Sequence, residues 1–83
     1  MREGRVPMAE DEAAIREELR VVEEDLARLR ETAAELRRSV GENADSPTDA
    51  AETATLITMA EEQEALADAL EARRETLARK LES

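Results

Sequence analysis

Cysteine, histidine and all three aromatic amino acids are missing from this chain of 83 residues. Without histidine or cysteine, the usual zinc ligands and the usual thiol and imidazole chemistry are excluded, and we expect no metal, no cofactor and no catalytic residue. Without aromatic side chains there is no platform on which bases could stack, and the net charge of -10 repels phosphate backbones. Direct binding to nucleic acid is therefore not expected.

Long apolar runs are also absent. The longest uncharged stretch lies between Glu52 and Glu61 and is much too short to cross a bilayer, and the N-terminus has no apolar signal region. We therefore expect a cytoplasmic protein that makes no contact with a membrane. Residues 1–7 are predicted to form a disordered tail, and Met8 is an alternative start of the chain.

Helix breakers are few, because the chain has only two glycines and two prolines, while alanine, glutamate, leucine and arginine all favour helix. This composition predicts helices over about residues 8–40 and 48–82, separated by an acidic tip at residues 41–47. Gly41 is expected to end the first helix in a left-handed conformation, after two arginines in the last turn. Pro47, preceded by Ser46 as a cap, is expected to open the second helix.

Apolar residues of both predicted helices follow the spacing of a coiled coil, alternately three and four residues apart. Two arms of similar length joined by a short link pack antiparallel. The sequence therefore predicts an all-α fold, an antiparallel two-helix coiled-coil hairpin. The first series consists of Ile15, Leu19, Val22, Leu26, Leu29, Ala33, Leu36 and Val40, and the second of Leu56, Met59, Gln63, Leu66, Leu70 and Leu77, with Arg73 between the last two.

A fold about Asn43 and Ala44 would set which residues of the two series face each other. Gln63 would then lie opposite Leu26 and fix the register at some cost in stability, or else contact a ligand. The residues expected to determine packing and register are Leu19, Leu26, Gln63, Leu66 and Leu70. The facing pairs predicted in this way are Leu36 with Thr53, Ala33 with Leu56, Val22 with Leu66, and Leu19 with Leu70.

The second predicted helix has a wider apolar face than the first, because Ile57, Ala60, Ala67 and Ala69 lie beside its series. A hairpin of two helices buries little surface of its own relative to the entropy lost on ordering the chain. Association into a four-helix bundle is the usual remedy. We therefore expect a homodimer.

Acidic residues are concentrated in one part of the chain: nine lie between Glu42 and Glu71, with no basic residue among them. Such a run is typical of a solvated helix face, and it could also bind a basic or helical surface of another protein. A hairpin offers no concave site that could shift carboxylate pKa values, so an enzyme is not expected. The candidate partner-binding residues are Glu42, Asp45, Asp49, Glu52 and Glu62.

The tip sequence Asp45-Ser46-Pro47-Thr48-Asp49-Ala50-Ala51 resembles the tip of the TraR/DksA group of RNA polymerase secondary-channel factors, which, like the Gre group, use a helical hairpin. No counterpart of the DksA zinc finger or of the Gre C-terminal domain is present. The resemblance implies a hairpin-only transcription regulator whose Asp45 and Asp49 approach the active-site magnesium of RNA polymerase. This is the alternative to our main hypothesis, a non-enzymatic interaction or adaptor module that acts through coiled-coil or bundle association.

Overall fold

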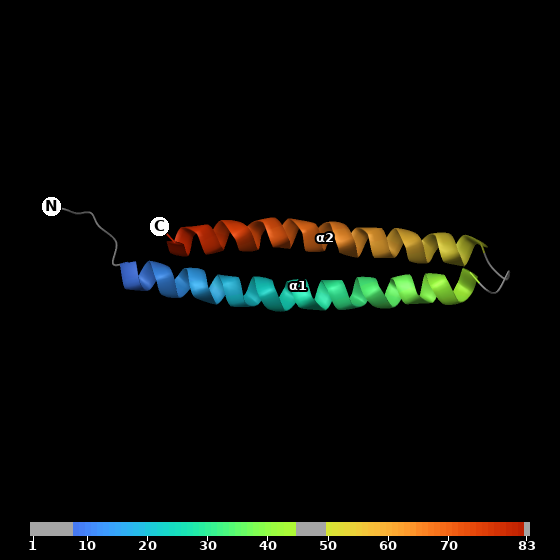
Figure 1. Ribbon diagram of the computed structural model, residues 1–83, viewed down its shortest axis with the longest axis horizontal. Coiled ribbons are helices and arrows are strands. Elements are labelled where there is room, and N and C mark those ends of the chain that lie inside the picture. The colour runs from blue at the N-terminus through green and yellow to red at the C-terminus, as the bar shows by residue number, and fades with distance from the viewer. Residues whose placement is uncertain (1–7, 45–49, 83) are drawn as a thin grey trace.

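The computed structural model of this chain describes residues 8–44 and 50–82. They form two helices, α1 (Met8–Ala44) and α2 (Ala50–Glu82), which lie side by side and run in opposite directions (Figure 1). At 1.5 Å per residue the helices are about 55 and 50 Å long. The predicted all-helical hairpin is thereby confirmed. The predicted disordered tail, the Ser46 cap and Pro47 lie outside the described residues.

Helix α1 continues beyond its predicted end. Gly41 lies inside the helix, and no described glycine has a positive φ, so the predicted left-handed cap at this residue is wrong. The last turn of α1 contains no basic residue, because the helix ends at Ala44 and not near the arginines. A single glycine inside a helix costs about 1 kcal/mol of helix stability. This cost is offset by the burial of its neighbours, because Val40 and Asn43, on either side of Gly41, are both half-buried. Packing on both sides of Gly41 thus favours continuation of the helix.

Replacing Gly41 with alanine is expected to stabilise the hairpin by about 0.5–1 kcal/mol, because alanine loses less backbone entropy in a helix. A β carbon at this position would meet no atom within 4 Å, so no steric cost opposes the gain. Urea unfolding followed by circular dichroism measures the change. The reverse substitution at an exposed helical site, Ala54→Gly, is the matched control and should destabilise by a similar amount. A loss of stability in Gly41→Ala would instead indicate the left-handed cap.

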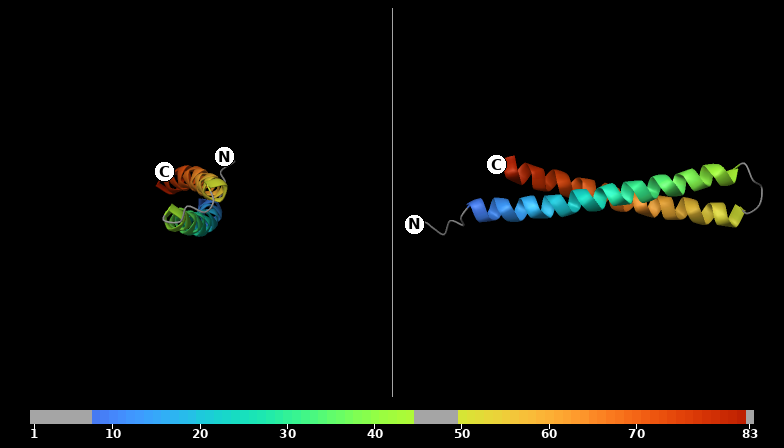
Figure 2. Two further views of the ribbon diagram at one scale, coloured as in Figure 1. Left: turned by 90° about the vertical axis from the view of Figure 1, so that its right-hand side faces the viewer. Right: turned by 90° about the horizontal axis from the view of Figure 1, so that it is seen from below.

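The predicted series of apolar residues on α1 faces α2 throughout. Val22, Leu26 and Ala33 are buried, and the other members of the series are half-buried. The alternating spacing of three and four residues keeps one stripe of the helix against its neighbour, as in a coiled coil. In Figure 2 the two helices cross at a shallow angle as they wrap around each other.

On α2 only every second member of the predicted series faces α1. Leu56, Gln63, Leu70 and Leu77 are buried or half-buried, as predicted. The positions between them are occupied by Ala60, Ala67 and Arg74, each one residue further along the chain than predicted. Leu66 is 53% exposed and Met59 43% exposed, whereas Ala67 and Ala60 are 5% and 0% exposed. The predicted packing role of Leu66 is therefore wrong, and small alanine side chains take that place.

Ion pairs along both edges of the contact define how the helices are aligned. On one edge Arg30 bonds Glu71 at 3.0 Å. On the other edge Arg73 bonds Glu18 through Nε at 2.9 Å and Nη2 at 2.5 Å. The positions midway between these pairs are residue 24 on α1 and residue 72 on α2, which therefore lie at about the same height. Counting outward from them places Leu26 level with Leu70, and Ala33 level with Gln63.

The observed alignment differs from the predicted one by about one heptad. Gln63 was predicted to face Leu26 but lies at the level of Ala33, and Leu70 was predicted to face Leu19 but lies at the level of Leu26. The reason is that α1 extends to Ala44 and α2 begins only at Ala50, so the chain reverses further along than Asn43 and Ala44. The other predicted facing pairs, which assumed the same fold point, are displaced with them.

Candidate interaction surface

The residues predicted to bind a partner do not form one compact cluster. Glu42 is exposed near the end of α1, Glu52 is exposed in the first turn of α2, and Glu62 is exposed ten residues further along, at about 15 Å. Asp45 and Asp49 lie outside the described residues.

Part of the acidic run on α2 is matched by arginines of α1. Arg37 donates from Nε and Nη2 to the two carboxylate oxygens of Glu64, at 2.9 and 2.8 Å. Glu71 accepts from Arg74 at 2.6 Å and from Arg30 at 3.0 Å. The hydrogen bond from Arg37 is the largest cause of the lowered pKa of Glu64, and the hydrogen bond from Arg74, within α2, is the largest cause of the lowered pKa of Glu71. The acidic surface open to a partner is therefore narrower than the sequence indicated.

The pair between Glu64 and Arg37 predicts a pH-dependent contribution to stability. The pKa of folded Glu64 is lowered from its ordinary value of 4.5, mainly by the hydrogen bond from Arg37. A lowered pKa contributes stability above the unfolded value, and this is lost as the pH falls through the folded one. Glu64→Gln is therefore expected to have a slightly lower unfolding midpoint than the parent at pH 7, and this difference should vanish at about pH 2, where the carboxyl is protonated.

Thermal unfolding of both chains at the two pH values, followed by circular dichroism, measures this difference. Glu31→Gln is the matched control, because Glu31 is exposed on α1 and makes no ion pair with another described residue. Its midpoint should follow the parent at both pH values. A Glu64→Gln midpoint equal to the parent's at pH 7 would mean that solvent screening cancels the pair.

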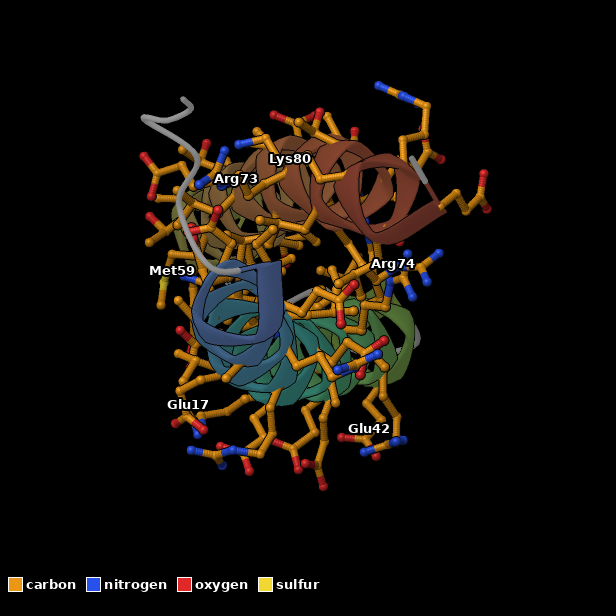
Figure 3. All side chains as sticks on the ribbon, turned by 90° about the vertical axis from the view of Figure 1, so that its left-hand side faces the viewer. Glu17, Glu42, Met59, Arg73, Arg74 and Lys80 are labelled. Carbon is orange, nitrogen blue, oxygen red and sulfur yellow. The ribbon has the colours of Figure 1, made fainter. Side chains whose placement is uncertain are left out.

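A second stripe of residues with coiled-coil spacing lies on α2, beside the buried contact and along the edge where Arg73 bonds Glu18 of α1. Its members are again alternately four and three residues apart. Figure 3 shows Met59 and Arg73 on one side of the hairpin, and Arg74 on the opposite edge. Six of its seven members are exposed and Thr76 is half-buried. We call these residues the outer stripe: Thr55, Met59, Glu62, Leu66, Ala69, Arg73 and Thr76.

The centre of the outer stripe is apolar. Met59, Leu66 and Ala69 contribute only hydrocarbon and thioether surface. Thr55 donates its hydroxyl to the carbonyl of Ala51 at 3.0 Å, and Thr76 donates to that of Ala72 at 3.2 Å. Each threonine therefore satisfies its polar group within α2. The charged groups of the stripe are Glu62 and Arg73, one on each side of Leu66 and Ala69.

The hydrophobic pattern alone does not reveal this stripe, because it assigns Met59 and Leu66 to the contact within the hairpin. A signal was nevertheless present: the spacing of three and four residues can be followed along α2 twice, once through Ala60 and Ala67 and once through Met59 and Leu66. Because alanine was counted as peripheral, the larger side chains were placed inside. The structure shows the reverse arrangement.

Within residues 8–44 and 50–82, no three acidic side chains are grouped so that they could hold a metal ion. Neither α1 nor α2, as far as the structure describes them, is long and apolar enough to span a membrane.

Comparison with known proteins adds no relationship. No protein-family model matches the chain, and no curated protein or solved structure is significantly similar to it. The resemblance of the tip to secondary-channel factors therefore stays a hypothesis, and the function must be argued from the two helices themselves.

Proposed function

We propose that this protein is a non-enzymatic module of the cytoplasm that acts by helix association, and that it forms a homodimer through a four-helix bundle. The observation that carries this proposal is the exposure of two large apolar side chains, Leu66 and Met59, on one stripe of α2. Isolated exposed apolar residues are common, but a stripe with coiled-coil spacing matches the surface of another helix.

The small interior of the hairpin also supports this proposal. Six described hydrophobic residues are buried, and three of them are alanines, which contribute little apolar area. Each Å² of apolar surface removed from water contributes about 25 cal/mol, so covering the outer stripe would add stability that a single hairpin does not have. The buried residues are Val22, Leu26, Ala33, Ala60, Ala67 and Leu77.

Sedimentation equilibrium tests the proposal. Because the chain has no Trp, Tyr or Phe, interference optics are needed. At micromolar concentration we expect a mass about twice the 9.2 kDa of the chain. The variant Leu66→Asp should sediment as a monomer and keep its helical circular dichroism, because Leu66 does not pack inside the hairpin. A parent chain that stays at the monomer mass throughout the micromolar range would overturn the proposal.

The shape of the hairpin favours a second candidate function, which is regulation of transcription by the acidic tip. Two helices of about 55 and 50 Å, linked at one end only, could carry that end into the secondary channel of RNA polymerase (Figure 1). In this case the chain with Asp45→Asn and Asp49→Asn should lose its effect on transcription by purified polymerase and still dimerise. Loss of the effect in Leu66→Asp, but not in the tip variant, would favour helix association instead.

A further inference from the structure

We propose that the outer stripe of α2 pairs with the outer stripe of a second copy, antiparallel, about a two-fold axis near residues 67 and 68. This inference rests on the proposed function and specifies which surface associates and in which register. The occupant is a second copy of the chain because the outer stripe is complementary to itself in both shape and charge.

The alternating spacing makes the outer stripe complementary to itself in shape. Two antiparallel helices with stripes of this kind pack in layers of two facing residues. In each layer, one residue is followed by the next stripe residue three positions later, and the residue that faces it is followed by the next one four positions later. In the outer stripe Leu66 belongs to the first kind and Ala69 to the second. About the proposed axis, Leu66 lies opposite the partner's Ala69, and the two-fold axis repeats this layer. A large side chain thus meets a small one twice at the centre.

The charges of the outer stripe are complementary in the next layer outward. The same register places Glu62 opposite the partner's Arg73, again twice. Glu62 is exposed and makes no hydrogen bond or ion pair with another described residue. Arg73 donates to Glu18 through Nε and Nη2, and its side chain is 42% exposed, which leaves Nη1 for a second carboxylate. The apolar centre therefore has one ion pair at each end, and the two-fold axis makes the two pairs equivalent.

Other registers lack this complementarity. Parallel stripes would set Glu62 against the partner's Glu62 and Arg73 against the partner's Arg73, and like charges at such positions are destabilising. An antiparallel shift by one heptad in one direction sets Leu66 against the partner's Glu62. A shift in the other direction sets Ala69 against the partner's Arg73. Only the register about residues 67 and 68 keeps the apolar residues together and the charges paired.

Exchange of the two charges between different copies tests the register. Glu62→Arg alone places an arginine against the partner's Arg73, and Arg73→Glu alone places a glutamate against the partner's Glu62. Each variant is therefore expected to associate at least about tenfold more weakly than the parent, a loss of about 1.4 kcal/mol. In an equimolar mixture the two variants form complementary pairs, so sedimentation of the mixture should recover most of the parental dimer. Glu31→Arg, an equal charge change on the outer side of α1, should dimerise like the parent.

Cysteine cross-linking provides a second measurement, because Arg73→Glu also breaks the bond to Glu18. The chain contains no cysteine, so single substitutions are unambiguous. A mixture of Leu66→Cys and Ala69→Cys chains should oxidise to a covalent dimer faster than a mixture of Leu66→Cys with Ala34→Cys, which lies exposed on α1. Equal rates in both mixtures, or dimers that persist in both charge variants, would overturn the register and leave the proposed function intact. A monomeric parent would overturn both.

Discussion

Replacing Leu77 with alanine is expected to lower the free energy of unfolding by about 2–5 kcal/mol. Leu77 is 1% exposed and is the largest fully buried side chain among the described residues. The substitution removes its buried hydrocarbon and leaves a cavity that two rigid helices can close only in part. Since small domains are stable by roughly 5–15 kcal/mol, a large share of the stability of this hairpin should be lost.

The matched control for this prediction removes the same atoms from an exposed site. Leu66→Ala should change the free energy of unfolding by less than about 1 kcal/mol, because Leu66 is 53% exposed in the hairpin. Urea unfolding of both variants, followed by far-ultraviolet circular dichroism, measures the two effects. The protein concentration must be too low for association, so that only the hairpin contributes. Equal losses in the two variants would place Leu66 inside the hairpin after all.

Most of α1 could be predicted from the sequence because its polar and apolar residues are sharply separated. Leucine or valine occupies most positions of its series, charged residues surround them, and no other stripe competes. In such a helix the hydrophobic pattern alone determines the buried face. Only the C-terminal end of α1 was mispredicted, because glycine can either continue a helix or end it in a left-handed conformation. The packing of the residues beyond Gly41 favours continuation of the helix.

The buried face of α2 could not be predicted in the same way, since this helix is apolar or small on several sides. Hydrophobicity favoured Met59 and Leu66 over Ala60 and Ala67 as inward residues. Alanine, however, allows the two helices to approach closely. The edge charges distinguish the two arrangements, because they bring Glu64 and Glu71 beside arginines of α1. Charge pattern was therefore the better guide to register than hydrophobicity.

The candidate site was also only partly accessible from the sequence. Glu62 was predicted as a partner-binding residue, and it lies exposed in the outer stripe, but the apolar residues around it were assigned to the interior. Whether an exposed leucine belongs to one contact or another depends on a rotation of the helix by a single residue, about 100°. A rotation of this size exchanges the buried stripe with the stripe beside it, and only the packing of both helices together determines which of the two is buried.

Ala67→Asp and Leu66→Asp test this rotation directly, because the two variants introduce the same charge at neighbouring residues. Ala67 is 5% exposed between the helices, so an aspartate there is buried, and Arg30 of α1, at about the same height, already bonds Glu71; the expected cost is about 3–5 kcal/mol. Glu64 and Glu71, three and four residues away on the same face, repel it further. Ala67→Asp is therefore expected to lose most of its helical circular dichroism at pH 7.

Leu66→Asp is expected to keep that signal, because the new carboxylate points to solvent in the single hairpin. It should instead lose self-association, since the partner's Ala69 would then face a desolvated charge. The two variants thus separate folding from association by moving one carboxylate to the next residue. The opposite result, an unfolded Leu66→Asp and a folded Ala67→Asp, would mean that Met59 and Leu66 pack against α1 and that the outer stripe does not exist as a free surface.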